Sequence, residues 1–251
     1  MVFASRLDGK KRRRSRRDAA RPRWFGVPRL PVIGAALLFA FVAAPYVIAP
    51  FYRTIDPVST PMLWRWVTGQ RVQRLVVPLN RIARSLPLTV ILAEDASFCR
   101  NYGIDPGAIR EALAQSDDDI ADSRGASTIT QQVAKNLFLW PGHSVVRKVL
   151  EIPLAIWLTL VLPKRRIMDI YLNIAEWGPN GEFGAEAAAR SAFGIPAREL
   201  NAAQAAELAA ILPNPVARSA RNPGRLVREL AALYVVRAAT YPGHDACLYA
   251  H

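Results

Sequence analysis

The sequence predicts an all-α protein in which one N-terminal transmembrane helix precedes a helical domain. Three observations support this fold class. The run from Leu30 to Tyr52 contains no charged residue and is long enough for a membrane-spanning helix. Farther along, Ile129, Val133 and Leu137 recur every four residues, as on the apolar side of an amphipathic helix. The last third of the chain is rich in alanine, which lets helices pack closely.

The positive charge of the chain is concentrated at its N-terminus. The formal net charge is +13, and residues 1–29 carry +9 of it, from 11 Lys or Arg and 2 Asp or Glu. A basic arm of this kind can bind nucleic acid or an anionic membrane surface. Because a membrane-length apolar run follows, we interpret the arm as a topology signal that contacts lipid headgroups, and we expect no nucleic-acid partner.

The apolar run is interpreted as an uncleaved anchor. As a helix it would be about 35 Å long, compared with about 30 Å for the hydrocarbon core of a bilayer. The basic arm should stay in the cytoplasm and place the chain from about residue 53 outside. A cleaved signal peptide is the alternative, but its best cleavage site, Val42-Ala43-Ala44, is followed by Pro45, which is a poor context.

These features divide the chain into four parts: a basic cytoplasmic arm (1–29), a transmembrane anchor (30–52), a juxtamembrane subdomain (53–85) and a helical domain (86–251). Helix-start signals then occur at Ser85, Asp105-Pro106, Ser144, Asn201 and Pro223. The apolar segment 152–162 is too short for a second membrane span, so we expect a buried core helix with a kink at Pro153.

The helix that follows residue 126 should present a polar stripe opposite its apolar one. Either of its first two hydroxyl residues can cap the first turn. The polar residues are Thr128, Gln131, Gln132, Lys135 and Asn136. A solvated face usually mixes Glu with Lys, whereas hydroxyls, amides and one ammonium suit a polyhydroxylated or phosphorylated ligand. The alternative is an ordinary polar helix face.

Two adjacent carboxylates, Glu94 and Asp95, end an otherwise apolar helix. Apolar surroundings raise the pKa of a carboxylate and suit it to proton transfer; the alternative is a solvated pair at a helix end. Asp95 is also a candidate metal ligand. The run Asp117-Asp118-Asp119 could bind a cation as well, but we interpret it as a solvated loop.

Two cations accompany a third carboxylate. Arg147 and Lys148 precede Glu151 by four and three residues, so all three can share a helix face. The group is either a helical salt bridge worth about a few tenths of a kcal/mol, or a carboxylate among cations that bind a diphosphate.

The cysteines indicate little. Cys99 and Cys247 are too few for a disulfide framework. His244, Cys247 and His251 could form a metal site, but we interpret this end of the chain as a frayed tail, because no second ligand pair is in view.

Four blocks of the chain carry a family resemblance. They are Glu94 to Gly103, Gly125 to Asn136, Arg147 to Glu151 and Lys164 to Asn173. In this order they resemble the motifs of the peptidoglycan glycosyltransferases, glycosyltransferase family 51, and in particular its monofunctional biosynthetic transglycosylases.

The chain departs from these motifs at three positions. Asn101 replaces a His, His143 replaces a cation, and Ala231 replaces an Arg of the fifth motif, for which Arg228 or Arg237 could substitute.

The resemblance implies a lysozyme-like α-helical fold with a membrane-dipping subdomain. It also implies the polymerisation of lipid II into β-1,4 glycan strands with release of undecaprenyl diphosphate. Glu94 would be the general base and Glu151 a second catalytic residue. The substrate would be bound by Ser127, Thr128, Gln131, Gln132, Lys135, Asn136, Arg147 and Lys148.

The expected partners are lipid II, the growing glycan strand, membrane lipids and other cell-wall synthesis proteins. Mg²⁺ or Mn²⁺ could assist, and no organic cofactor is expected. The expected location is the bacterial inner membrane, with the N-terminus in the cytoplasm and the catalytic domain in the periplasm.

Two alternatives stay open. A lysozyme-like lytic enzyme would cut glycan, but it would have little use for Lys135 and Lys148 as diphosphate-binding cations. An inactive membrane-anchored scaffold would explain the three departures from the motifs.

Overall fold

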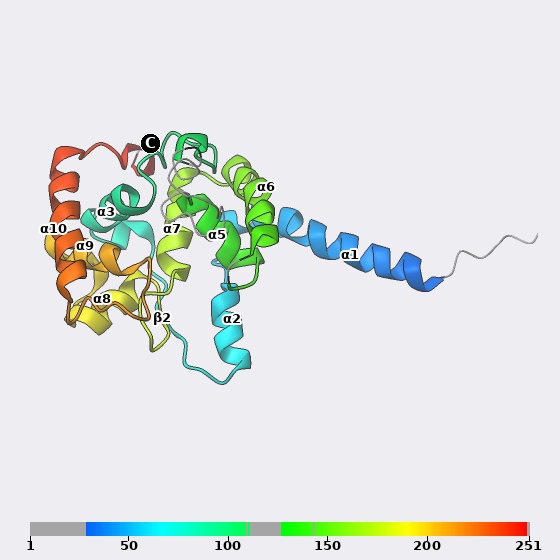
Figure 1. Ribbon diagram of the computed structural model, residues 1–251, viewed down its shortest axis with the longest axis horizontal. Helices are drawn as coiled ribbons and strands as arrows, with labels where there is room; N and C mark the ends of the chain where they lie inside the picture. The colour runs from blue at the N-terminus through cyan, green and yellow to red at the C-terminus, as the bar shows by residue number, and fades with distance from the viewer. Residues whose placement is uncertain (1–28, 109, 111–126, 143, 250–251) are drawn as a thin grey trace, which may run out of the picture. The chain divides into compact units, whose positions relative to one another are not determined.

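The computed structural model describes residues 29–108, 110, 127–142 and 144–249. Over these residues the protein is mostly helical, with one two-stranded sheet (Figure 1), so the predicted all-α class is confirmed. The acidic run 117–119, Gly125, His143 and His251 lie outside the described residues.

The first helix, α1 (Arg29–Ile48), has no charged residue after its first. Pro31–Arg53 is long and apolar enough to cross a membrane, with a mean hydropathy of 2.3. Large apolar side chains such as Leu37 and Phe41 are exposed along it. An exposed apolar helix is costly in water and favourable in lipid. From Val42 onward the chain forms a separate compact unit.

The elements of this unit follow in chain order. They are η1 (Ala49–Arg53), α2 (Thr60–Val67), β1 (Gln73–Arg74), η2 (Leu79–Arg81), α3 (Ser85–Glu94), α5 (Ile129–Phe138), α6 (Val145–Val161), α7 (Lys164–Ile174), β2 (Glu182–Phe183), α8 (Ala185–Phe193), η3 (Ala197–Glu199), α9 (Ala202–Ile211), α10 (Arg225–Thr240) and η4 (Ala246–Leu248).

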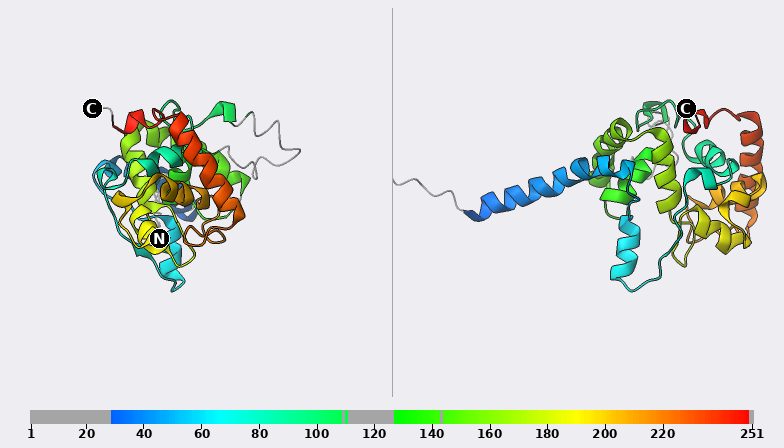
Figure 2. Two further views of the ribbon diagram at one scale, coloured as in Figure 1. Left: turned by 90° about the vertical axis from the view of Figure 1, so that its left-hand side faces the viewer. Right: turned by 180° about the vertical axis from the view of Figure 1, so that it is seen from behind.

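Two groups of helices build the core. The helices α3, α9 and α10 pack on one another, and α5 packs on α6 and α7 (Figures 1 and 2). Alanines such as Ala205 and Ala209 on α9 are fully buried and let the first group pack closely. The C-terminal end of α3 faces α5 at the boundary between the groups, through the contact of Glu94 with Gln132.

The compact unit also contains a short parallel sheet of two strands. Gln73 on β1 pairs with Glu182 on β2, and the next residues, Arg74 and Phe183, pair in register. Asn173, near the end of α7, bonds to the chain that follows β1. Its side-chain amide donates a hydrogen bond to the backbone carbonyl of Val77 at 2.9 Å.

The helix α6 differs in detail from the prediction, whereas α5 confirms one of its two predicted caps. The helix α6 runs continuously from Val145 to Val161 with Pro153 inside it, so the cationic block and the apolar segment form one element. The helix α5 begins at Ile129, because Thr128 is its N-cap and forms a capping box with Gln131.

The prediction of a frayed C-terminal tail is wrong for the described residues. Asp245 and Leu248 are fully buried, and Cys247 forms a disulfide with Cys99 across a sequence separation of 148. The chain after α10, drawn red in Figure 1, returns to pack on α7. A tail fixed by a covalent bond and by buried side chains cannot fray independently of the domain.

Candidate active site

Glu94 is the last residue of α3 and is mostly buried. Its Oε2 accepts a hydrogen bond from Nε2 of Gln132 on α5 at 2.9 Å. The hydroxyl of Tyr171 on α7 donates to Oε1 of the same amide at 3.1 Å. An ionised carboxylate can only accept, so the NH₂ end of the amide points at Glu94 and its carbonyl end faces the Tyr171 hydroxyl. Three helices therefore hold one carboxylate.

The surroundings of Glu94 make it a stronger base than an ordinary glutamate. Burial raises its pKa, while the hydrogen bond from Gln132 and the charges of Lys135 and Arg218 partly oppose the rise. A carboxylate with a raised pKa accepts a proton more readily than an ordinary one.

We predict that Gln132→Leu shifts the pH dependence of activity to higher pH. The substitution removes a donor that favours the ionised carboxylate, so the pKa of Glu94 should rise further. The acidic limb of the kcat profile should move up, with a larger loss of rate at low pH than at high pH. Tyr171→Phe, which only frees the amide, should move the limb less. A limb that stays in place for Gln132→Leu contradicts this electrostatic role.

Asp95, in contrast, is held by the protein on both of its oxygens. It accepts from the Asn101 amide at 2.9 Å, from the Ser97 hydroxyl at 3.0 Å and from the backbone N–H of Ile129 at 3.1 Å. The last bond satisfies a free amide in the first turn of α5. Asp95 thus joins the loop after Glu94 to the helix that carries Gln132.

This loop shows how the protein accommodates Asn101. Its amide group donates to Asp95, and its Oδ1 accepts from Nζ of Lys164 at 2.9 Å. Burial lowers the pKa of Lys164 to about 8. Gly103 follows with φ +92° and lies so close to the backbone that a Cβ would meet the carbonyl oxygen of Ala155 at 2.4 Å, which explains why this position needs glycine.

The donor set around Asp95 does not fit a metal ion. Its oxygens already face three hydrogen-bond donors, and Lys164 is a nearby cation. No group of three His, Cys, Asp or Glu that could hold a metal occurs in the part of the chain that the structure describes. Hard divalent cations need several free oxygen ligands, so we derive no step through a metal.

The polar stripe of α5 separates into two parts. Thr128 and Gln131 are buried, and each side chain bonds the backbone N–H of the other to close the capping box. Gln132, Lys135 and Asn136 are half-buried and line a common cavity. The first pair therefore shapes the helix start, and the second set faces the space where a ligand would lie.

The cationic block surrounds a buried carboxylate. Glu151 on α6 is 2% exposed. It pairs with Arg147 and, at 3.5 Å, with Nζ of Lys148. Lys148 also donates to the hydroxyl of Ser127, which ties α6 to the residues just before α5. Burial lowers the pKa of the neighbouring Lys135, an effect that Glu151 opposes.

One hydrogen-bond donor of Arg147 has no partner among the described residues. This donor is its Nε, which is buried. A buried unpaired N–H of a guanidinium is costly. Arg147 lines the same cavity as Lys135, so its positive charge is close to the space where an anionic ligand would lie.

Glu94 and Gln132, which are hydrogen-bonded to each other, line two different cavities. One has a volume of about 610 Å³ and includes Glu94, Ser127, Arg100 and Arg237 in its lining. The other, of about 290 Å³, is lined by Gln132, Lys135, Asn136, Arg147 and Tyr171 among others. The base thus opens to one cavity, and the cations Lys135 and Arg147 line the other.

The structure distinguishes the two substitutes for the missing fifth-motif arginine. Arg237 lines the cavity of Glu94, whereas Arg228 is exposed and donates to the carbonyl of Pro223. Ala231 is buried. The sequence patterns did not indicate Arg218, whose charge lowers the pKa of Glu94. Arg218 follows a proline-rich turn and belongs to none of the motifs.

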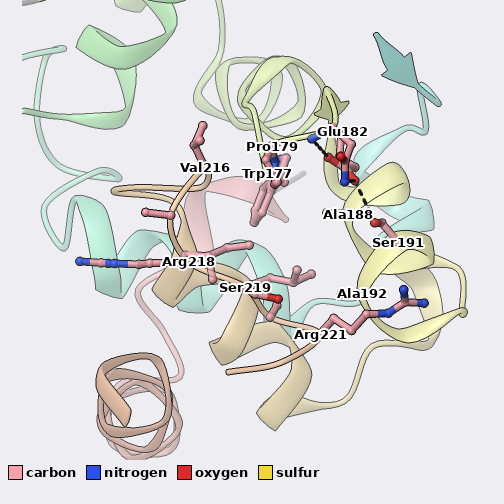
Figure 3. A pocket seen from close by; sticks show the side chains of 16 residues that line it. Trp177, Pro179, Glu182, Ala188, Ser191, Ala192, Val216, Arg218, Ser219 and Arg221 are labelled. Atoms are coloured by element: carbon pink, nitrogen blue, oxygen red, sulfur yellow. Dashed lines mark hydrogen bonds between the residues drawn. The ribbon is translucent and has the colours of Figure 1, made fainter. Parts of the chain in front are cut away.

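Another cavity, of about 210 Å³, lies between Trp177 and Arg218 (Figure 3). Glu182 at its edge is buried and accepts from the backbone N–H of Asn180 at 2.9 Å and from the Ser191 hydroxyl at 3.0 Å. The cavity contains neither Glu94 nor the cationic group, so we do not include it in the candidate active site.

Comparisons with known proteins show the family of this chain. The Transglycosylase family model matches residues 61–237. A biosynthetic peptidoglycan transglycosylase of Rhodopseudomonas palustris is 56% identical over 210 residues, covering 84% of this chain and 92% of the relative. The one from Nitrobacter hamburgensis is 54% identical over 216 residues, with 86% and 92% covered.

A more distant relative has the same name. The biosynthetic peptidoglycan transglycosylase of Agrobacterium fabrum is 47% identical over 213 residues, with 84% of this chain and 93% of the relative covered. Identity of this extent over nearly the whole relative, together with the matched domain and the helical fold, settles the family. The chain belongs to the peptidoglycan transglycosylase family and is a glycosyltransferase enzyme with a lysozyme-like domain.

Proposed function

We propose that this transglycosylase polymerises lipid II into β-1,4 glycan strands and releases undecaprenyl diphosphate, with Glu94 as the general base. The observation that carries the proposal is the position of Glu94, which opens to one cavity while Gln132 links it to a second, cationic one. An attacking hydroxyl needs a base, and a departing diphosphate needs cations. The cavity lined by Glu94 supplies the base, and the cavity lined by Lys135 and Arg147 supplies the cations.

On the base side, the 4-hydroxyl of the acceptor sugar would lie in the cavity of Glu94. Its oxygen forms the new bond to the anomeric carbon of the donor as its proton passes to the Glu94 carboxylate. The bond from the anomeric carbon to the diphosphate oxygen breaks, and the configuration inverts. Gln132 and Tyr171 hold the carboxylate in place for this transfer.

On the cation side, Lys135, Arg147 and Lys148 would meet the negative charge that develops on the diphosphate. Arg147 and Lys135 line the same cavity, which supports this placement. Gln132 and Asn136 line the same cavity and can hydrogen-bond sugar or phosphate oxygens. Fixed cations in a largely buried site stabilise such charge more than water does.

Glu151 would act through its neighbours. Its oxygens are paired with Arg147 and Lys148 and it is buried, so we propose that it orients these cations rather than contacting substrate. Thr128 and Gln131 would likewise serve by shaping the start of α5. Mg²⁺ or Mn²⁺ would then bind the diphosphate of the substrate itself, and a rate measured before and after chelation tests that contribution.

The apolar surface supports a membrane-bound substrate. Trp64, Trp66 and Val67 on α2 are exposed, as are Val146 and Val149 on α6. Exposed aromatic and aliphatic side chains suit a membrane interface. We propose that membrane lipids and lipid II approach from this surface, and that other cell-wall synthesis proteins act with the enzyme on the growing glycan strand.

We also propose that the enzyme lies in the bacterial inner membrane with its catalytic domain in the periplasm. The basic arm supports this orientation. The disulfide between Cys99 and Cys247 supports it independently, because disulfides persist in oxidising compartments.

We predict that a reporter which is active only outside the cytoplasm will be active when fused after residue 60. The anchor should still be present in the purified protein. The checks are reporter activity with a cytoplasm-specific reporter as the matched control, and the sequence of the mature N-terminus. A mature N-terminus near residue 45 would contradict the uncleaved anchor.

The experiment that tests the function is incubation of the full-length protein with labelled lipid II in vesicles. Glycan polymer is the expected product. Degradation of pre-made glycan without polymerisation would favour a lytic enzyme, and no reaction with either substrate would favour a scaffold.

A further inference from the structure

The C-terminal segment after α10 contacts both ends of the helix that carries Glu94. At the N-terminal end of α3, Arg84 donates two hydrogen bonds to Asp245, at 2.8 and 3.0 Å. Just beyond the C-terminal end of α3, Cys99 is bonded to Cys247. We call residues 245–249 the C-terminal clasp.

The clasp makes contacts of several kinds, and the Arg84 side chain that meets Asp245 is 62% exposed. Asp245 is fully buried, and a two-pronged guanidinium–carboxylate pair fixes orientation as well as distance. The Arg84 guanidinium also lies 4.8 Å from the ring centre of Tyr249, within reach of a cation–π interaction. On the far side, Arg165 of α7 donates to the carbonyl of Leu248 at 2.9 Å. The clasp therefore joins α3 to α7.

The loop between Glu94 and Cys99 connects the C-terminal clasp to Glu94, the proposed base. Asp95 in this loop accepts from the backbone N–H of Ile129 at the start of α5. Gln132, one turn farther along α5, donates to Glu94. A shift of the loop would therefore move Glu94 and its partner relative to each other.

We propose that the C-terminal clasp positions Glu94 against Gln132, and that the bond between Cys99 and Cys247 is needed for full turnover. The inference rests on the proposed role of Glu94 as the base. The two cysteines and Asp245 are positioning residues, since they act through α3 and its following loop. A displacement of about 1 Å at a reacting group can cost about a hundredfold in rate.

A disulfide that closes so long a loop also stabilises the fold in general. A lower melting temperature without it would therefore not distinguish positioning from simple stabilisation. The distinguishing readouts are turnover in the folded state and the pH dependence of kcat. If the clasp is released, Glu94 loses the hydrogen bond from Gln132 that lowers its pKa, so the pKa should rise as predicted for Gln132→Leu.

The test uses the full-length enzyme in vesicles with lipid II. Its rate is measured as purified, after reduction by dithiothreitol with alkylation of the thiols, and in the double variant Cys99→Ser/Cys247→Ser. Dithiothreitol supplies two electrons and two protons to the disulfide and closes to its own cyclic disulfide. The double variant treated with dithiothreitol is the matched control and should not respond. Asp245→Asn tests the clasp without redox chemistry.

We expect reduction and the double substitution each to lower kcat about tenfold or more, with the KM for lipid II changed less than about twofold. The helical circular dichroism should be retained, and the acidic limb of the kcat profile should move to higher pH, as predicted for Gln132→Leu. Asp245→Asn should give a smaller change in the same directions.

Three results would overturn the proposal: free thiols at Cys99 and Cys247 in the purified enzyme, equal turnover of oxidised and reduced protein, or a loss of rate that only accompanies a loss of helical signal. These outcomes are separate from the fate of the proposed function. Glu94→Gln tests the base itself, and that variant can be inactive whether or not the clasp matters.

Discussion

Replacing Glu94 by Gln should lower the rate of lipid II polymerisation by about 10²–10⁴, the contribution of a positioned general base. The amide has the size of the carboxyl group and can still bond Gln132, but it cannot take the proton of the attacking hydroxyl. The cationic cavity is lined by Gln132, the hydrogen-bond partner of Glu94, and not by Glu94 itself. Binding of a diphosphate-containing donor analogue should therefore persist, so the loss should appear in kcat.

Folding of this variant should survive for an electrostatic reason. Burial raises the pKa of Glu94 in the folded protein. The contribution of the carboxyl group to stability is therefore complete at pH values below its unfolded pKa, and it is lost as the pH rises through the folded pKa. When Glu94 is ionised, the wild-type enzyme holds a buried charge that Glu94→Gln does not have.

The measurements are initial polymerisation rates with labelled lipid II, the affinity for the donor analogue, and a thermal melt at pH 7. A melting temperature equal to or above that of the wild type is expected. A near wild-type rate for the variant would remove Glu94 from the role of base. A loss of rate caused by unfolding would also contradict this role.

Replacing Lys148 by Ala should produce the second large effect, with a different signature. Removing one fixed donor to a developing negative charge typically costs about 10²–10³ in rate. Lys148 should also contact the diphosphate in the ground state, so donor affinity should fall together with kcat. This joint loss distinguishes a cation at the leaving group from a base at the attacking hydroxyl.

Two control variants sharpen the result for Lys148. Lys148 donates to the hydroxyl of Ser127, so Ser127→Ala shows whether the lysine works only by tethering that residue. Arg225→Ala removes an equal charge from an exposed pair with Glu229 on α10, which should change little. If Ser127→Ala reproduces the whole loss, Lys148 is a tether and does not bind the diphosphate.

The helices were predictable wherever local patterns determine them. The spacing of Ile129, Val133 and Leu137 predicted α5, and all three side chains are buried. Asn201 predicted the start of α9, and its side chain caps that helix as expected. Such signals act over a few residues, so they survive in the sequence without knowledge of the tertiary fold.

The candidate site was predictable only in its residue types. The sequence indicated a carboxylate at the end of an apolar helix and cations around Glu151, because burial cost and helical spacing are local properties. It also led us to treat Thr128 and Gln131 as ligand-facing, since the stripe alone cannot tell a capping box from a binding face. Their burial depends on the helices packed against α5.

The helical class, the apolar anchor behind a basic arm and the kinds of chemical groups at the site follow from the sequence alone. The contacts of Glu94 with Gln132, and of Gln132 with Tyr171, become visible only in the folded chain. The same is true of the position of Arg237, rather than Arg228, at the cavity of Glu94 and of the bond between Cys99 and Cys247. The physical reason is separation along the chain: Cys99 and Cys247 are 148 residues apart. Contacts over such distances arise from the packing of whole helices, and no short-range periodicity encodes them.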